Sequence, residues 1–284
     1  MKIGVQLAGM NPKFWTAGAQ AADEAGFESV WLPEHLVFPV EMNGSPHAGD
    51  SHPPIPSNTP AFDALLSLAA IAATTKDIRL GTNVYNIGLR HPFVTARAIC
   101  TLDVISGGRV EFGIGSSWLE EEWDATGLDF ATRGRRVDEA IEVCRRLWSE
   151  DVIEYHGEFF DFQPVMFNPK PIQQPQPSLL IGGDGAAAKR RAALVGDAWL
   201  PMNHSLGELP AAMAAISEQR AAAGREGTTT LTIGGGIDGP NDVDRYRAAG
   251  VDRVIVHPFT TSKEAIDGIK RFGDEVLTKL DLDA

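Results

Sequence analysis

The sequence predicts an α/β fold, a (β/α)8 TIM barrel with insertions, and three observations lead to this prediction. Short apolar segments typical of strands alternate with longer amphipathic segments typical of helices along the whole chain. About eight such pairs occur, which is the number that this barrel requires. The 284 residues match the ~250 residues of a typical barrel plus insertions. A doubly wound sheet is the alternative, and regular alternation to the end of the chain favours the barrel.

The first half of the chain supplies the first four strand–helix pairs. Strands are expected at 2–7, 28–32, 78–84 and 110–114, and helices at 11–25, 60–75, 93–105 and 133–148. Gly26 follows the first helix in the position where a left-handed residue ends many helices. Pro60 stands at the start of the second helix, where a residue without an N–H is tolerated.

The second half continues the alternation. Strands are expected at 178–181, 198–200, 231–236 and 253–257, and helices at 186–195, 206–223, 241–249 and 262–277. No shift of composition marks a domain boundary, so we expect a single domain over residues 1–284.

Two insertions interrupt this pattern. Residues 33–59, after the second strand, form a loop rich in Pro, His, Gly and Ser, and its length favours a lid or a binding loop. Residues 152–162, after the fourth helix, place His156 and Gly157 between aromatic runs, which is typical of a hairpin. His47 and His52 in the long loop lack an evident third ligand, so we expect no metal site.

Composition and charge exclude several classes of function. The 38 acidic residues outnumber the 25 Lys and Arg, and the formal net charge of −13 argues against nucleic-acid binding, which needs a basic surface. No apolar run approaches the ~18 residues that span a bilayer, so we expect no membrane segment. The first residues lack the features of a signal peptide. Cys100 and Cys144 have no metal-like spacing and are expected to be buried, reduced thiols of a cytoplasmic protein.

Small and amide residues replace aliphatic ones at the ends of two predicted strands. The third strand runs into Gly81-Thr82-Asn83-Val84-Tyr85-Asn86, and the fourth runs into Gly113-Ile114-Gly115-Ser116-Ser117. Ligands bind at the carboxyl ends of the strands in parallel barrels. These two segments therefore predict a site where a flat ligand approaches the backbone.

These segments, with others in a fixed order, resemble the luciferase-like flavin and deazaflavin oxidoreductase family over essentially the whole chain. The matching motifs are GFESVWLPEH at 26–35, RLGTNV at 79–84, RHP at 90–92, GIGSSWLEEEWDATGLDFATRGRRVDEAIE at 113–142, HGEFFDF at 156–162, NPKPIQQPQPSLLIGG at 168–183 and GDAWLP at 196–201. The pattern is most similar to the branch that uses coenzyme F420, a 5-deazaflavin.

The resemblance implies roles for residues that follow the second and third strands. It places a non-proline cis peptide at Asn83–Val84, which would support one face of the deazaflavin ring. It also places an acid and a histidine after the second strand, matching Glu34 and His35. Glu34 would lie near the ring, and both residues are catalytic candidates. His35 is the candidate for proton handling, because an unperturbed histidine pKa of ~6.5 suits that work.

The resemblance further implies that Gly115, Ser116 and Ser117 hydrogen-bond the cofactor. The phosphate of the cofactor tail is expected at Gly182, Gly183 and Asp184, because glycines allow close approach and a helix N-terminus attracts an anion. Asp184 is expected to cap the helix that follows. Lys189, Arg190 and Arg191, one turn later, are candidates to meet a polyanionic tail.

One departure from the family pattern concerns the catalytic acid. The sugar-phosphate dehydrogenase branch has a Gly-Glu pair after the glycines of strand four, whereas this chain has Ser117-Trp118. A sugar-phosphate substrate is therefore disfavoured, and the general acid stays unassigned. Trp118, Glu121 and Glu122 are candidates to line the pocket, but the two glutamates are expected to face solvent at a helix start, where negative charge is favourable.

The sequence thus predicts an F420-dependent oxidoreductase that transfers a hydride between the deazaflavin and a small organic substrate. Two alternatives remain open: an FMN-dependent monooxygenase that consumes oxygen, and a barrel that binds a flavin or deazaflavin without turnover. The resemblance also implies a homodimer. No residue in the variable loops identifies the substrate.

Overall fold

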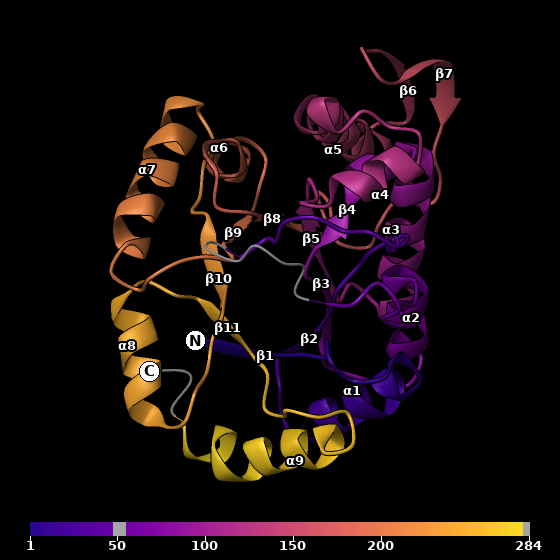
Figure 1. Cartoon of the computed structure of the whole chain (residues 1–284). Helices are drawn as coiled ribbons and strands as arrows, with labels where there is room; N and C mark the ends of the chain where they lie inside the picture. The colour runs from indigo at the N-terminus through magenta and orange to yellow at the C-terminus, as the bar shows by residue number, and fades with distance from the viewer. Residues whose placement is uncertain (48–54, 281–284) are drawn as a thin grey trace.

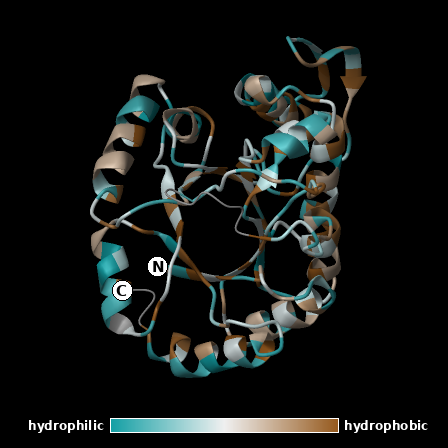
Figure 2. Cartoon of the chain, in the orientation of Figure 1, coloured by the Kyte–Doolittle hydropathy of each residue, from teal (hydrophilic) through white to brown (hydrophobic). Residues whose placement is uncertain are grey.

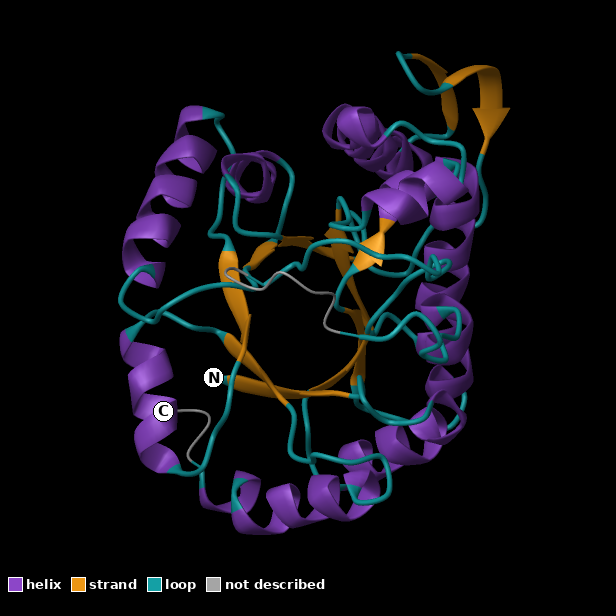
Figure 3. Cartoon of the chain, in the orientation of Figure 1, coloured by secondary structure: helices purple, strands orange, loops and turns teal. Residues whose placement is uncertain are grey.

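The computed structural model describes residues 1–47 and 55–280, and its centre is a closed barrel of parallel strands (Figures 1 and 3). The strands are β1 (Lys2–Gln6), β2 (Ser29–Leu32), β3 (Arg79–Thr82), β5 (Val110–Gly115), β8 (Ser178–Gly182), β9 (Ala198–Leu200), β10 (Thr230–Gly234) and β11 (Arg253–Val256). Within the described residues their order is β3-β2-β1-β11-β10-β9-β8-β5, and pairing of β3 with β5 closes the eight-stranded barrel. The predicted (β/α)8 fold is confirmed, and the doubly wound alternative is wrong.

The barrel is closed by main-chain pairing in a regular register. Leu80 lies opposite Val110 where β3 meets β5, and Lys2 lies opposite Arg253 where β1 meets β11. Every residue of β2 and β11 is buried, as expected for parallel strands with side chains packed on both faces. A two-residue strand, β4 (Tyr85–Asn86), continues past β3 and pairs with the end of β5.

Helices surround the barrel as an outer ring (Figure 1). They are α1 (Trp15–Glu24), α2 (Ala64–Ala72), α3 (Pro92–Ser106), α5 (Arg133–Ser149), α6 (Ala186–Leu194), α7 (Leu209–Ala222), α8 (Pro240–Ala248) and α9 (Ala265–Glu275). A short helix, α4 (Glu120–Ala125), follows β5. Figure 2 shows hydrophobic and hydrophilic residues interspersed along the ring helices, as expected when only one face packs on the barrel. No helix in the described part of the chain has the length and apolarity to cross a membrane.

Four predicted helix starts lie too early: those at 206 and 262 precede α7 and α9 by three residues, and those at 11 and 60 precede α1 and α2 by four. The second helix begins at Ala64, not Pro60, because the Asp63 carboxylate accepts a hydrogen bond from Leu66 N and caps the helix there. The first α-helix begins at Trp15, because residues 12–14 form a separate 3-10 turn.

Both insertions are present. The hairpin is confirmed as the antiparallel pair β6 (Val152–His156) and β7 (Asp161–Met166), which projects beyond the helical ring (Figure 1). The long loop after β2 contains no helix or strand in its described parts, 33–47 and 55–59. His52 lies outside the described residues.

The amino-terminal end of the barrel is filled by one aromatic ring and a network of ion pairs. Trp31 is fully buried, and a Cβ on Gly81 would lie 2.3 Å from its ring, so this strand position requires glycine. Arg253 pairs with Glu28 at 2.6 Å and with Glu111 at 3.2 Å. Arg79 pairs with Glu111 at 2.5 Å. Trp31 therefore fills the barrel interior, while a separate cavity of about 840 Å³ at this end is lined by Lys2, Glu111 and Arg253 among others.

Candidate active site

A cavity of about 370 Å³ lies at the carboxyl ends of β2, β3, β5 and β8. It brings together ten residues that the sequence analysis assigned to the site, all except the basic residues of α6: Glu34, His35, Asn83, Val84, Gly115, Ser116, Ser117, Gly182, Gly183 and Asp184. These residues come from four separate strand ends, and only closure of the barrel makes them neighbours. The position agrees with the general rule for ligand sites in parallel barrels.

Val84 forms part of the cavity lining, and two glycines make room for it. The Asn83–Val84 peptide bond is cis, as the resemblance implied. A Cβ on Gly115 would lie 2.6 Å from Val84 Cγ2, and a Cβ on Gly182 would lie 2.7 Å from Val84 Cγ1. The Val84 side chain therefore occupies the space beside Gly115 and Gly182. The sequence analysis had reserved this space for the ligand.

The edge of the cavity at α6 offers backbone donors. Gly185 is the N-cap residue of α6, and no side chain caps the helix there. A Cβ on Gly185 would meet nothing within 4 Å, so this side is open. The predicted cap by Asp184 is wrong, because its carboxylate instead accepts hydrogen bonds from Met202 N and Asn203 N in the loop after β9. The helix start keeps its capacity to bind an anion.

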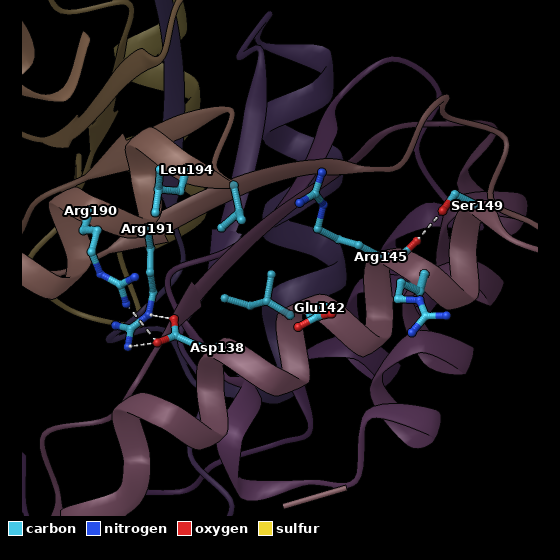
Figure 4. A pocket seen from close by; sticks show the side chains of 10 residues that line it. Asp138, Glu142, Arg145, Ser149, Arg190, Arg191 and Leu194 are labelled. Carbon is cyan, nitrogen blue, oxygen red and sulfur yellow. Dashed lines mark hydrogen bonds and ion pairs between the residues drawn. The ribbon is translucent and has the colours of Figure 1, made fainter. Parts of the chain in front are cut away.

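The two arginines of α6 are directed away from this cavity. Arg190 Nη2 lies 3.0 Å from Asp138 Oδ2, and Arg191 Nε lies 2.6 Å from Asp138 Oδ1. Figure 4 shows both guanidinium groups turned toward Asp138, in a groove between α5 and α6. Lys189 lies over the Trp199 ring at 5.4 Å. The expectation that the two arginines meet a cofactor tail is therefore not supported by their placement.

Glu34 is buried and fully engaged by hydrogen bonds. Its Oε2 accepts from Asn86 N at 2.8 Å, and its Oε1 accepts from Arg90 Nη2 at 2.6 Å. Burial of Arg90 disfavours its charge, but the Glu34 carboxylate outweighs that effect and raises the pKa of the guanidinium. Glu34 therefore ties the end of β2 to β4 and Arg90.

His35 pairs with an acid that the sequence analysis placed in solvent. His35 Nδ1 lies 2.9 Å from Glu122 Oε2, and the Glu122 side chain is fully buried. The expectation that Glu122 faces solvent is wrong, because the loop after β2 covers it and donates Leu36 N and Val37 N to its Oε1. Helical spacing carried the signal: the neighbouring Leu119 and Trp123 share its inward face, and both are fully buried.

A second cavity of about 340 Å³ adjoins the first and shares Pro33, Glu34 and His35 with it. Its remaining lining is mostly apolar: Ala8, Gly9, Met10, Asn11, Pro12, Trp15, Phe38, Ile55, Thr59, Pro60, Ala61, Phe62 and Ser262. No Lys or Arg side chain lines it among the described residues. We call the first cavity the polar lobe and the second the apolar lobe. His35 lines both.

The described residues hold no group of three or more His, Cys, Asp and Glu side chains arranged to bind a metal ion. The chemistry available to them is hydrogen bonding and proton transfer, centred on His35 and Glu122. A parallel barrel with such a pair at its carboxyl end has the architecture of a TIM-barrel enzyme.

Comparison with known proteins identifies the family. The family model of luciferase-like monooxygenases matches residues 3–237. The chain belongs to this family, whose relatives use flavin or deazaflavin cofactors.

The relatives found by sequence include proteins with and without a named function. An uncharacterized protein of Mycobacterium tuberculosis is 31% identical over 281 residues, covering 94% of this chain and 96% of the relative. The FMNH2-dependent dimethylsulfone monooxygenase of Pseudomonas putida is 27% identical over 264 residues, covering 91% of this chain and 65% of that protein.

Similar solved structures include two F420 enzymes. One is an F420-dependent secondary alcohol dehydrogenase in complex with an F420–acetone adduct, with a TM-score of 0.78, 17% identity and 99% coverage of both chains. The other is the coenzyme F420-dependent tetrahydromethanopterin reductase of Methanopyrus kandleri, with a TM-score of 0.78, 17% identity and 98% coverage of both. At this identity the similarity establishes the fold.

Proposed function

We propose that this protein is a coenzyme F420-dependent oxidoreductase that transfers a hydride between the deazaflavin and a small organic substrate. The observation that carries the proposal is that one cavity gathers Glu34, His35 and the residues at the ends of the third, fourth and fifth predicted strands that the family resemblance assigned to the cofactor ring and phosphate. Two structurally similar proteins named as F420-dependent give it further support.

The polar lobe fits the cofactor. Asn83 and Val84 would support the ring, and Ser116 and Ser117 would face its edge. The uncapped start of α6 at Gly185 would receive the phosphate through backbone N–H groups. When bound, the deazaflavin supplies the hydride acceptor or donor, and the protein supplies position and proton handling.

His35 and Glu34 have different parts in this proposal. His35 would exchange the proton, because it lines both lobes and has an imidazole suited to that role. Both Glu34 oxygens already accept hydrogen bonds, so we assign Glu34 to positioning the cofactor side of the cavity.

The apolar lobe favours a neutral, largely apolar substrate with one reactive oxygen, such as an alcohol, ketone or enone. None of its described lining residues is Lys or Arg, so a carboxylate or phosphate would lose hydration there without gaining a partner. This agrees with the absence of the family's Gly-Glu pair at Ser117-Trp118.

The first test is titration of the purified protein with oxidised F420, reduced F420 and FMN, followed by fluorescence or calorimetry. We expect micromolar or tighter binding of F420 and much weaker binding of FMN. A substrate screen with reduced F420 would then compare neutral enones with carboxylated counterparts of the same skeleton. Binding of neither cofactor would contradict the site assignments at Asn83, Ser116 and Gly182 together.

The second candidate is an FMN-dependent monooxygenase, which the named Pseudomonas putida relative favours. Tight FMN binding together with oxygen uptake would establish it in place of the F420 enzyme. The third reading, a barrel that binds cofactor without turnover, is tested by His35→Ala. This substitution removes the proton-exchanging group, so turnover should fall ~10²-fold or more if the protein is an enzyme.

We also propose that the protein is a homodimer that resides in the cytoplasm. Leu66 on α2 and Val94 on α3 are 74% and 59% exposed, and these helices lie side by side in the ring (Figure 1). Exposed apolar side chains on adjacent helices support an interface there. Light scattering on the purified protein measures the mass, and a monomer would contradict the dimer.

A further inference from the structure

We propose that Glu122 is a positioning residue that fixes the tautomer of His35, so that Nε2 is the ring nitrogen presented to a bound substrate. The inference rests on the proposed function for its catalytic consequence. Its structural part concerns only the protein's own side chains and can be tested without any cofactor.

The three hydrogen bonds of Glu122 divide between its two oxygens. Oε1 accepts from Leu36 N at 2.6 Å and from Val37 N at 3.3 Å. Oε2 lies 2.9 Å from His35 Nδ1. An ionised carboxylate can only accept, so Nδ1 must carry the hydrogen. This leaves the lone pair on Nε2.

The position of His35 makes this assignment useful. The imidazole is only 14% exposed and lines both lobes. Among residues 1–47 and 55–280 the side-chain hydrogen bond of His35 is made through Nδ1, and none is made to Nε2. The rings of Phe38 and Trp118 lie 4.8 and 6.1 Å from the imidazole and limit its movement. Glu122, through its hydrogen bond to Nδ1, and the rings of Phe38 and Trp118 therefore fix the imidazole. Its Nε2 then lies between the two lobes with its lone pair available.

The proton balance of the proposed reaction follows from this tautomer. A bound deazaflavin would accept the hydride from the carbon of a substrate alcohol, and the Nε2 lone pair of His35 would accept the O–H proton. The carbonyl product forms, and the resulting imidazolium is stabilised by Glu122 behind Nδ1. In the reverse direction the imidazolium returns the proton from Nε2 to the substrate oxygen.

Glu122→Gln reverses the tautomer with little change of shape. The two backbone N–H groups of Leu36 and Val37 require an acceptor, so they hold the oxygen of the introduced amide. Its NH2 group must then face His35 Nδ1 and donate to it. Nδ1 becomes an acceptor, and the imidazole hydrogen moves to Nε2.

Glu121→Gln is the matched control. Glu121 is the preceding residue of α4 and also binds the loop after β2, accepting from Asn43 N and Nδ2 at 3.1 and 2.6 Å. Among the described residues its hydrogen bonds go to Asn43 and not to His35, so the control weakens loop anchoring and leaves the imidazole unchanged.

The experiment is ¹⁵N NMR of histidine-labelled protein without cofactor, with the His35 signals assigned from a His35→Asn variant. We expect Nδ1–H in the wild type and in Glu121→Gln, and Nε2–H in Glu122→Gln. An Nε2–H tautomer in the wild type, or the same tautomer in wild type and Glu122→Gln, would overturn the proposal.

Kinetic measurements distinguish an effect of Glu122 on proton transfer by His35 from an effect on cofactor binding. Glu122→Gln should lower kcat ~10²-fold or more and leave F420 affinity within about twofold, because only the proton acceptor is lost. Unchanged kcat with a reversed tautomer would overturn the catalytic part. Failure of F420 to bind wild type would refute the proposed cofactor and leave the NMR result standing.

Discussion

Both ends of the barrel contain buried charged groups, but the two ends differ in how many of the polar atoms of these groups have a partner. At the amino-terminal end, Arg253 lies between Glu28 and Glu111, and each group meets an opposite charge. At the carboxyl end, Arg90 Nη1 is buried without a hydrogen-bond partner, and His35 Nε2 faces the cavities. The charges of the amino-terminal network are all paired, whereas Arg90 and His35 keep bonding capacity at the end where the two lobes lie.

The largest expected loss of stability comes from a substitution in the ion-pair network of the amino-terminal end. Arg253→Ala removes the common partner of Glu28 and Glu111, which leaves Glu111 with Arg79 and Glu28 with Lys2 as their remaining cations. Removal of one partner of a buried pair costs ~3–5 kcal/mol when the other charge is left unpaired, so urea unfolding should show a loss of up to that order. A loss below ~1 kcal/mol would show that the network contributes little to the scaffold.

The same substitution should change the dependence of stability on pH. Burial opposes the ionisation of Glu28, but Arg253 outweighs it and lowers the pKa of Glu28 below 4.5. A depressed carboxyl pKa stabilises the folded state above pH 4.5, and this contribution is lost as the pH falls below it. The stability difference between wild type and Arg253→Ala should therefore shrink in acid. A difference that grows in acid would contradict this sign.

An intermediate effect is expected where the carboxyl end forms the polar lobe. Gly115→Ala would place a Cβ 2.6 Å from Val84 Cγ2 and displace that side chain. We expect cofactor affinity to fall about tenfold or more, equivalent to ~1.4 kcal/mol. Gly234→Ala is the control, because Gly234 also ends a strand and a Cβ there meets nothing within 4 Å. Equal effects of the two substitutions would show that Val84 does not depend on its glycine neighbours.

The sequence predicted the scaffold and the members of the site better than it predicted their contacts. Alternation of apolar segments is a local signal, and it was sufficient for the barrel. The burial of Glu122 depends on a loop far away in sequence, so its place at a helix start favoured solvent instead. Asp184 was assigned to the nearest helix, yet it bonds to the loop after β9.

The roles of the glycines could not be predicted for a similar reason. Gly115 and Gly182 were interpreted as space for a ligand, because glycine at a strand end permits close approach. Their neighbour is Val84, which comes from a third strand end. Only the closed sheet, in which β5 lies between β3 and β8, places the three together.

The smallest expected effect on stability comes from Gly185→Asp, and this substitution also tests whether the start of α6 at the carboxyl end binds the cofactor phosphate. Gly185 has φ −71° and ψ 163°, a conformation open to any residue, and it caps α6 without a side chain. Gly185→Asp supplies that cap and should raise the free energy of unfolding by a few tenths of a kcal/mol. The same carboxylate would occupy the donors proposed for the phosphate and repel it, so F420 affinity should fall by at least about tenfold. Gly185→Ala, which adds no charge, should bind F420 nearly as well as wild type. If Gly185→Asp gained stability and kept its affinity, the phosphate would have to bind elsewhere, and the start of α6 would belong to the scaffold.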